Sequence, residues 1–185
     1  MNKYLRGLVV IPTGAVKMGL NKLWHGKRFS GPALCQISPL SEITFDRGGE
    51  LRIGSGFKMR DGAKLRVRRG AVCKLGKNVS LNANNVLTCR ESITLGDDVT
   101  LSPNVQIYDH DHDYACEGGV AAGKFLCTGV EIGSNVWIGA NCVILRGSKI
   151  GDNCVIGANT VIKGEIPANS VVYQQRETRI KLRER

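Results

Sequence analysis

The feature that most constrains this chain is an isoleucine that returns at every sixth position in its C-terminal part. The six residues are Ile132, Ile138, Ile144, Ile150, Ile156 and Ile162. A glycine directly follows four of them, and a mostly small or β-branched residue stands four places after each. A period of six fits neither an α-helix nor a series of hairpins. It predicts short flat strands that each point one side chain inward and end at a corner.

Three such strands are expected to close one turn of a triangular solenoid, about eighteen residues long. Each turn covers the apolar interior of the previous one, so that stacked turns share one narrow core. Glycine is expected at the corners because it tolerates backbone angles that other residues avoid. The pattern covers residues 50–107 and 130–167, about five turns. Its slips in register upstream indicate insertions or bulges at corners.

The repeat divides the chain into three parts. Residues 46–172 are expected to form the solenoid domain, and residues 108–129, which keep no period, are expected to leave it as a loop. Loops on rigid scaffolds are common places for chemistry. Residues 1–45 predict a basic amphipathic cap of one or two short helices, broken near Pro12 to Gly14. Residues 173–185 form a basic tail.

Basic residues are concentrated outside the middle of the chain. Lys+Arg number 26 and Asp+Glu 16, which gives a net charge of +10. No acidic residue occurs in residues 1–30, so an anionic partner is expected. We interpret this segment as a cap over the open end of the solenoid. The alternatives are a helix that binds anionic lipid at a membrane surface, and a subunit contact.

No run of residues approaches the ~18 to 20 apolar positions of a membrane-spanning helix, and no signal peptide is evident. The expected location is the cytoplasm, with the inner face of the membrane as one option. The 7 cysteines include no CxxC pair. They are interpreted as reduced thiols, mostly in the core, and neither a disulfide framework nor a structural zinc site is expected.

Residues 50–172 resemble the hexapeptide-repeat acyltransferases, on the motifs NVWIG (135–139), IGDN (150–153), VIGA (155–158) and IPANSVV (166–172). Within that family, residues 82–108 with the histidine that follows are similar to sugar O-acetyltransferases of the maltose and galactoside type. The basic leader is more similar to bacterial enzymes that acetylate surface polysaccharides or their lipid-linked precursors. The resemblance implies an all-β, left-handed parallel β-helix, a homotrimer, acetyl-CoA as donor and active sites between neighbouring subunits.

Two histidines stand at alternate positions in the loop, so that an extended backbone points His110 and His112 to the same side. Transfer of an acyl group to a hydroxyl needs a base, for which histidine is suited by its near-neutral pKa. Counted from the Asn-Val-Gln-Ile-Tyr run, the family's catalytic histidine is His112, and His110 is expected to contact substrate. Alternation places Asp109, Asp111 and Asp113 on the opposite face. A backbone carbonyl is therefore as good a candidate as an aspartate for orienting the base. For His110, the alternative to substrate contact is that it only solvates a turn.

The resemblance assigns the acceptor sugar to Asn82 and Asn84, because asparagine both donates and accepts hydrogen bonds. The alternative is that these residues only stack at corners of the solenoid. Arg90 stands where those enzymes often carry an acidic residue. This departure makes an anionic or carboxylated sugar a candidate acceptor.

The resemblance also assigns five residues to donor binding. Trp137 is too large for the interior, so it is expected to face outward beside the pantetheine arm. Ala140 and Ala158 would let that arm approach the backbone closely. Lys163 would lie near the pyrophosphate, and a tail cation such as Lys181 would meet the 3′-phosphate. Each residue also has an explanation that needs no ligand. Trp137 would pack the loop, the alanines would fit a thin coil, and Lys181 would belong to a solvated tail.

The expected function is therefore acetyl-CoA-dependent O-acetyl transfer to a sugar hydroxyl, in surface polysaccharide or glycan precursor synthesis, without metal and without a covalent enzyme intermediate. Alternatives are another acceptor (serine, an amino sugar or a xenobiotic) and a non-catalytic interaction subunit. Cys116 and Cys127 are the candidates for a covalent route. A zinc-dependent carbonic anhydrase needs three converging histidines, and His25 lies in the leader. The few aromatics and the lack of a recognition motif argue against nucleic-acid binding.

Overall fold

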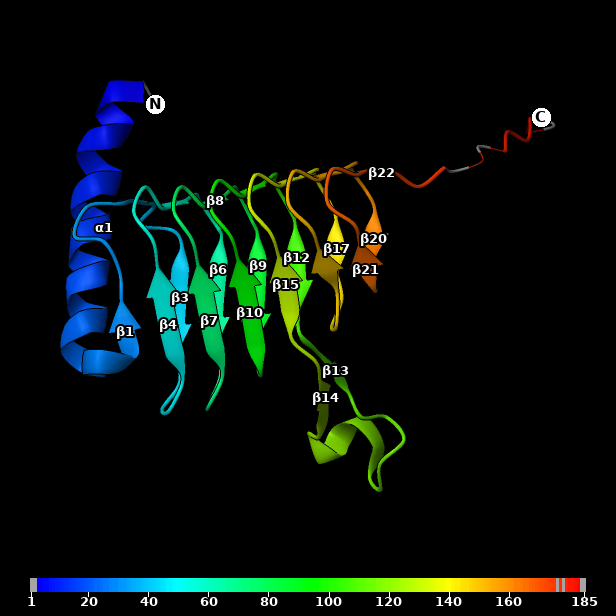
Figure 1. Cartoon of the computed structure of the whole chain (residues 1–185), viewed down its shortest axis with the longest axis horizontal. Coiled ribbons are helices and arrows are strands. Elements are labelled where there is room, and N and C mark those ends of the chain that lie inside the picture. Colours follow the sequence, from blue (N-terminus) through cyan, green and yellow to red (C-terminus); the bar gives the residue numbers. More distant parts are fainter. Residues whose placement is uncertain (1–2, 176, 178, 184–185) are drawn as a thin grey trace.

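The computed structural model describes residues 3–175, 177 and 179–183. The chain coils into a left-handed parallel β-helix, with a long helix at its N-terminal end and a loop that hangs from one edge (Figure 1). Left-handed crossovers are rare between parallel strands. The predicted fold class, including its handedness, is confirmed.

Three parallel sheets form the sides of the solenoid. The first contains β1 (Phe29–Ser30), β4 (Glu50–Ile53), β7 (Val72–Leu75), β10 (Ser92–Leu95), β15 (Val130–Ile132), β18 (Lys149–Ile150) and β21 (Glu165–Ile166). The second contains β2 (Gln36–Ile37), β5 (Lys58–Met59), β8 (Ser80–Leu81), β11 (Thr100–Leu101), β16 (Trp137–Ile138), β19 (Val155–Ile156) and β22 (Val171–Val172). The third contains β3 (Glu42–Phe45), β6 (Lys64–Val67), β9 (Val86–Cys89), β12 (Gln106–Tyr108), β17 (Val143–Ile144) and β20 (Val161–Ile162).

The core follows the six-residue period. All six isoleucines of the repeat are at most 3% exposed. Five of the residues four places further on, Val136, Cys142, Ser148, Cys154 and Thr160, are also buried. Burying an isoleucine side chain contributes ~1.5 to 3 kcal/mol relative to leaving it in water. The repeat therefore supplies a continuous core along the whole axis.

The coils are longer near the N-terminus, which explains the slips in register. Trp137 pairs with Val155, 18 residues later, whereas Glu50 pairs with Val72, 22 residues later. The longer coils carry strands of four residues in two of their three sheets. The predicted period of about eighteen residues holds only for the later coils.

The predicted role of the glycines that follow the aliphatic residues is wrong. These residues do not have positive φ; instead, a Cβ on Gly54 would lie 2.5 Å from the carbonyl carbon of Gly76 on the next coil. Close approach between coils therefore requires glycine there. Other glycines, among them Gly56 and Gly62, and Asp98 do have left-handed backbone at corners. At further corners asparagine supplies it, because its short side chain tolerates a positive φ. These residues are Asn78, Asn84, Asn104, Asn135, Asn141, Asn153, Asn159 and Asn169.

The N-terminal segment forms one helix, α1 (Lys3–His25), which continues through Pro12, so the predicted break is wrong. Val10 and Met18 lie on both sides of the proline and are both buried. Gly14 lies between them, and a Cβ there would be 2.3 Å from the carbonyl oxygen of Cys35. Packing on the solenoid end thus holds both halves of the helix in line, despite the hydrogen bond that proline removes.

α1 covers the N-terminal end of the solenoid (Figure 1). The Lys17 ammonium donates hydrogen bonds to the carbonyl oxygens of Ser38 (3.1 Å) and Ser41 (2.5 Å). A short 3₁₀ helix, η1 (Gly26–Arg28), leads into β1. Because β1, β2 and β3 already belong to the parallel ladder, the first coil lies within the segment 1–45 that was assigned to the cap.

The chain ends in the basic tail beyond β22. Gln174 caps the edge of β20, since its side-chain nitrogen donates to the carbonyl oxygen of Val161 (3.1 Å). Residues 176, 178, 184 and 185 of the predicted tail lie outside the described residues. No helix in the described part of the chain is long and apolar enough to cross a membrane.

Candidate functional site

The excursion loop contains a small antiparallel hairpin that carries both histidines. β13 (His110–His112) pairs with β14 (Phe125–Cys127), and a short 3₁₀ helix, η2 (Gly119–Ala122), lies between them. The hairpin stands away from the solenoid below the edge where the third sheet meets the first (Figure 1). The chain leaves the solenoid as predicted, but only after Tyr108, which still pairs with Thr88 in the third sheet.

The ring of Phe125 lies close to both histidines of the hairpin and to Arg90 of the solenoid. The ring centroid of His110 lies 5.5 Å from that of Phe125, and the centroid of His112 lies 4.5 Å away. The guanidinium carbon of Arg90 lies 3.4 Å from the same centroid, in a cation–π contact. Both histidines therefore lie on one side of the hairpin, as their spacing predicts, and Arg90 joins them.

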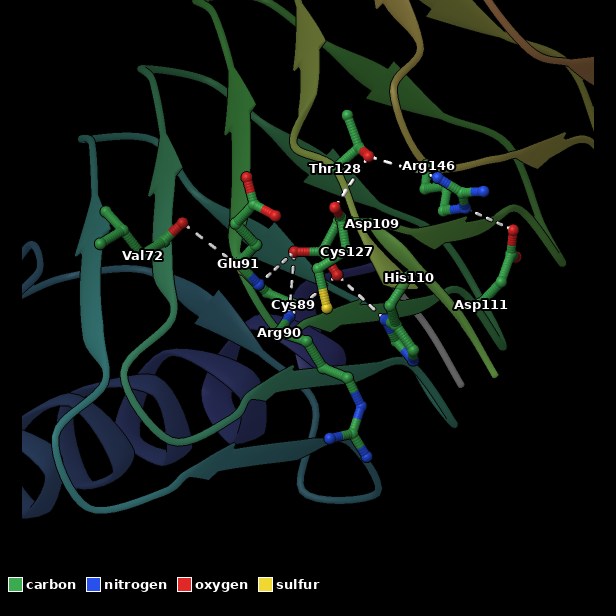
Figure 2. Close-up of polar contacts among 10 residues, drawn as sticks. All are labelled: Val72, Cys89, Arg90, Glu91, Asp109, His110, Asp111, Cys127, Thr128 and Arg146. Carbon is green, nitrogen blue, oxygen red and sulfur yellow. Dashed lines mark hydrogen bonds and ion pairs between the residues drawn. The ribbon is translucent and has the colours of Figure 1, made fainter. Parts of the chain in front are cut away.

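Asp109 fixes the base of the hairpin. Its carboxylate is fully buried, and it accepts hydrogen bonds from His110 Nδ1 (2.9 Å) and from the backbone N–H groups of Arg90 (2.9 Å) and Glu91 (2.8 Å) (Figure 2). Burial alone would raise the pKa of Asp109, but the hydrogen bonds from His110, Glu91 and Arg90 outweigh it and hold the pKa below its ordinary value. The group is therefore a buried carboxylate that orients one imidazole.

The expected alternation of aspartates holds for Asp111 and fails for Asp109. Asp111 faces away from the histidines and pairs with Arg146, whose Nε lies 2.6 Å from Oδ2 (Figure 2). Asp109 precedes β13 and lies in a bend, so that the alternation of an extended strand does not apply to it. The bend turns its carboxylate toward His110.

The two histidines differ in their accessibility. The His110 side chain is only 12% exposed, and the ring centroid of Tyr108 lies 5.9 Å from its own. His112 is exposed, and its imidazole makes no hydrogen bond to any described residue. His112 is therefore the histidine that a ligand or a neighbouring chain can reach.

The predicted acceptor residues do not lie beside the histidines within one chain. Asn82 and Asn84 follow β8, at the edge where the second sheet meets the third. Arg90 follows β9, at the opposite edge of the third sheet, on the order of 15 Å away along the strand. Asn82 Nδ2 donates to the carbonyl oxygen of Leu101 (2.8 Å), and Asn84 has the left-handed backbone of the other corner asparagines.

A small polar pocket nevertheless opens at the asparagine edge. Its volume is about 270 Å³, and it is lined by Arg60, Asp61, Asn82, Ala83 and Pro103. The side chain of Asn82 therefore makes one hydrogen bond within the solenoid, and the residue also lines a polar pocket.

The predicted donor residues fall into two groups. Trp137 is 54% exposed and donates from its indole nitrogen to Ser102 Oγ (2.9 Å), beside a hollow of about 410 Å³. Ala140 and Ala158 stack on successive coils at the same edge of the solenoid, after β16 and β19. Lys163 follows β20 at the opposite edge of the third sheet, and Lys181 is exposed in the tail. Within one chain, Lys163 and Lys181 are thus not gathered with the alanines.

The surroundings of Cys127 disfavour its use as a catalytic thiol. All seven are free; five are buried, and the loop cysteines Cys116 and Cys127 are half-buried. Cys127 stands opposite His110 in the hairpin, but burial and the charge of Asp109 raise the pKa of its thiol. A raised pKa disfavours the thiolate that a cysteine nucleophile needs.

The third histidine lies elsewhere. His25 ends α1 and packs its ring against Phe45, with centroids 4.1 Å apart. Among the residues that the structure describes, no group of three or more histidine, cysteine, aspartate or glutamate side chains is arranged to hold a metal ion.

The roles of Phe125, Arg68 and Arg146 around the hairpin were not predicted from the sequence. Phe125 had one signal, because it is a lone phenylalanine in a loop of mostly small and polar residues. Arg68 had another, since it precedes Arg90 by 22 residues, the length of one early coil. The contact of Arg146 with Asp111 has no sequence signal, because it depends on how the hairpin folds back on the solenoid.

Comparison with known proteins gives matches over the same region. The model of the bacterial transferase hexapeptide (six repeats) family matches residues 129–164. WbbJ of Escherichia coli K12, whose name proposes a lipopolysaccharide biosynthesis O-acetyl transferase, is 30% identical over 132 residues, which cover 67% of each chain.

Two solved structures agree. The maltose O-acetyltransferase of Clostridium difficile 630 is 30% identical with a TM-score of 0.50, over 78% of this chain and 63% of that one. A galactoside acetyltransferase in complex with coenzyme A is 35% identical with a TM-score of 0.50, over 54% of this chain and 49% of that one. Together with the repeat, the buried hexad core and the loop, these matches show that the chain belongs to the hexapeptide-repeat acyltransferases.

Proposed function

We propose that the protein transfers the acetyl group of acetyl-CoA to a hydroxyl of a sugar, in a glycan or a surface polysaccharide precursor. The observation that carries this proposal is the accessible imidazole of His112, held on a hairpin outside the solenoid with His110 and Arg90 around Phe125. The names of the similar proteins support the reaction class, because they include maltose and galactoside acetyltransferases and one complex with coenzyme A.

His112 acts as the general base in this proposal. Its imidazole takes the proton of the acceptor hydroxyl while the oxygen attacks the thioester carbonyl of acetyl-CoA. The tetrahedral oxyanion then collapses, the C–S bond breaks, and the thiolate of CoA leaves and takes up the proton. A positioned base of this kind contributes ~10² to 10⁴ in rate. Accessibility favours His112 over His110, which is mostly buried.

His110 serves as a positioning residue and contacts the acceptor with its remaining nitrogen. Because the Asp109 carboxylate accepts from the Nδ1 atom of His110, Nε2 is the ring nitrogen that is left to contact the acceptor. A direct transfer without an acetyl-cysteine is favoured by the raised pKa of Cys127.

Acetyl-CoA fits the edge that carries Trp137, Ala140 and Ala158. The exposed indole and the hollow beside it offer an apolar wall, and the alanines leave the coil backbone open to close approach by the pantetheine arm. Lys163 and Lys181 are exposed cations that would meet the phosphates of the donor. The thioester supplies the activated acetyl group, while these side chains bind and orient it.

The separation of these groups favours a site completed by a second chain. Asn82 and Asn84 lie across the third sheet from the hairpin, and Lys163 lies across it from Ala158. We therefore include a homotrimer in the proposal, in which the histidine edge of one subunit faces the asparagine and alanine edge of the next. Closed cyclic assemblies bury such heterologous contacts without leaving an open end.

The outer face of α1 supports a second, peripheral contact. Val16, Leu20, Leu23 and Trp24 are 56 to 81% exposed on the side of the helix away from the solenoid. An apolar stripe in a segment without acidic residues is suited to the interface of a membrane with anionic lipid. We propose that the protein works in the cytoplasm, at the inner face of the membrane, where lipid-linked glycan precursors would be within reach.

Release of free CoA thiol from acetyl-CoA tests this function. The assay would use a panel of neutral, amino and uronic sugars, lipid-linked glycans, serine and a xenobiotic alcohol. Thiol release with a sugar, together with an O-acetylated product identified by mass spectrometry, is the expected result. If CoA thiol is released only with serine, an amine or a xenobiotic, the proposed sugar acceptor is wrong and that compound class takes its place. If no acceptor reacts and calorimetry detects no binding of acetyl-CoA, the enzyme proposal fails and a non-catalytic solenoid takes its place.

A further inference from the structure

Two arginines on successive coils lie side by side next to the histidine hairpin. β6 pairs in parallel with β9, and Val67 stands opposite Cys89. The residue after each strand therefore places Arg68 beside Arg90, one coil apart, or about 4.8 Å along the axis. Their proximity also lowers the pKa of Arg90, although burial is the larger cause.

The same ladder continues to the hairpin. β9 pairs with β12 as far as Thr88 opposite Tyr108, and the backbone N–H of Arg90 then donates to the carboxylate of Asp109, which directly precedes His110. The contacts of Phe125 agree with this register, because its ring touches both Arg90 and His110. The column therefore runs from Arg68 through Arg90 to the histidines.

The positive charge of this pair is only partly compensated, because Asp109 and Asp46 act on Arg90 without an ion pair and the Phe125 ring covers its guanidinium. Arg90 makes no ion pair and no side-chain hydrogen bond with any described residue, and its Nε is buried. The Nε atom of Arg68 is buried and unpartnered within the described chain as well, and the one ion pair of Arg68 is a long contact to Asp46 (3.6 Å). The Asp109 carboxylate is occupied by His110 and by two backbone N–H groups.

Guanidinium groups on neighbouring residues of successive coils repel one another and lose hydration where they are covered. An anion that bridges them would relieve both costs, and guanidinium groups match carboxylate and phosphate geometry well. Figure 2 shows the Arg90 side chain extending away from the Asp109 cluster, so that its end does not point at the internal carboxylate.

We infer that Arg68 and Arg90 form an anion subsite for the acceptor, which therefore carries a carboxylate or a phosphate near the hydroxyl that is acetylated. This inference rests on the proposed function and specifies its substrate class. The donor phosphates are the other anions available. Arg68 and Arg90, however, lie on coils before the hairpin, whereas the proposed donor residues Trp137, Ala140 and Ala158 lie on coils after it.

The test is a matched set of acceptors: methyl glucoside, methyl glucuronoside, the methyl ester of that glucuronoside, and glucose 6-phosphate. Wild-type protein should have a higher kcat/KM for an anionic acceptor than for its neutral partner. In Arg90→Gln the ratio of anionic to neutral kcat/KM should fall roughly 10- to 100-fold, the range for loss of a charge-assisted hydrogen bond. The glucuronoside and the sugar phosphate distinguish a carboxylate from a phosphate.

Three controls isolate the subsite. Arg69→Gln removes the same charge one residue from Arg68, at an exposed position, and should keep the ratio. Arg90→Lys keeps the charge without the planar fork and should have an intermediate ratio. Arg68→Gln repeats the test at the second position if Arg90→Gln does not fold. Raising the salt concentration should reduce the preference, because screening weakens the ionic contact.

Binding of the glucuronoside and the glucoside without acetyl-CoA, measured by ligand-detected NMR, separates this inference from the reaction. Anion-selective binding that Arg90→Gln abolishes supports the subsite even if no acceptor turns over. Equal rates and equal binding of neutral and anionic sugars by the wild type would overturn it. So would an Arg90→Gln variant whose only defect is a raised KM for acetyl-CoA, because the pair would then serve the donor.

Discussion

The Nδ1 atom of His110 lies 2.9 Å from the Oδ1 atom of Asp109, and that carboxylate has no exposed surface. The bond ties the first strand of the hairpin to the solenoid, because the same carboxylate accepts the N–H groups of Arg90 and Glu91 on the preceding coil. The position of both histidines therefore depends on one buried charge.

Replacing this charge should destabilise the protein in a pH-dependent way. Asp109→Asn retains the shape but presents an N–H₂ group toward N–H donors, and it should lower the free energy of unfolding by ~1 to 3 kcal/mol at pH 7. Because the folded pKa of Asp109 is lowered, its contribution is present above the ordinary value, about 3.9, and is lost as the pH falls through the lower native value.

Urea unfolding of both proteins at several pH values measures this difference. It should shrink as the solution is acidified below about pH 4. Glu117→Gln is the matched control, since this exposed carboxylate lies in the same loop and should give no difference. A destabilisation by Asp109→Asn that is the same at pH 7 and in acid would mean that the charge does not stabilise the hairpin.

The glycines between coils give a test of the fold. A methyl group on Gly54 would collide with the backbone of the next coil, so Gly54→Ala should lower stability by ~1 to 3 kcal/mol. Gly19→Ala in α1 meets no atom within 4 Å and should raise stability by ~0.5 to 1 kcal/mol, because alanine favours the helix. Thermal melts of both variants distinguish these outcomes. A Gly54→Ala protein as stable as the wild type would contradict the close packing of coils.

The exposed stripe of α1 predicts binding to anionic vesicles. Vesicles of phosphatidylglycerol and phosphatidylcholine should sediment the wild-type protein, and Leu20→Asp with Leu23→Asp should reduce the bound fraction by ~10-fold or more, since each leucine contributes ~1.5 to 3 kcal/mol on burial. Val171→Asp changes an equally exposed apolar residue at the far end of the solenoid and should bind normally. Equal sedimentation of all three proteins, or none by the wild type, would exclude this contact.

A site shared between subunits predicts complementation. His112→Ala and Asn82→Ala should each be weakly active alone, because each affects every site. Mixed trimers, refolded together in equal amounts, should regain roughly a quarter of wild-type activity, since random assembly joins an intact histidine edge to an intact asparagine edge at that frequency. Activity of the mixture that equals the mean of the two variants would place Asn82 and His112 in separate roles within one chain.

The solenoid was predictable from the sequence because its core residues recur with a short, regular period. The six isoleucines fix strand, corner and stacking together, and the structure buries all six. The helix was less predictable: Pro12 and Gly14 read as a break in isolation, but Val10 and Met18 anchor both halves on the solenoid end. Tertiary packing overrode a local signal there.

The residues of the candidate site could be named from the sequence, but the contacts between them could not. The spacing of His110 and His112 predicted that both point to the same side of the hairpin. The role of His112 as base was predicted from its position relative to the Asn-Val-Gln-Ile-Tyr run. The bend at Asp109 and the position of Phe125 under Arg90 depend on how the loop returns to the solenoid, which no periodicity encodes. The separation of Asn82 from the histidines also required the coil register.

Acetyl transfer with His112 as base is best tested by measuring kcat/KM for O-acetylation of the best acceptor by wild type, His112→Ala and His110→Ala. The acetylated product should be quantified by mass spectrometry, and acetyl-CoA binding by calorimetry. His112→Ala should lose ~10² to 10⁴ in kcat/KM and still bind acetyl-CoA, while His110→Ala should lose less. A His112→Ala protein that keeps its rate while His110→Ala loses it would contradict the account and assign the base to the histidine held by Asp109.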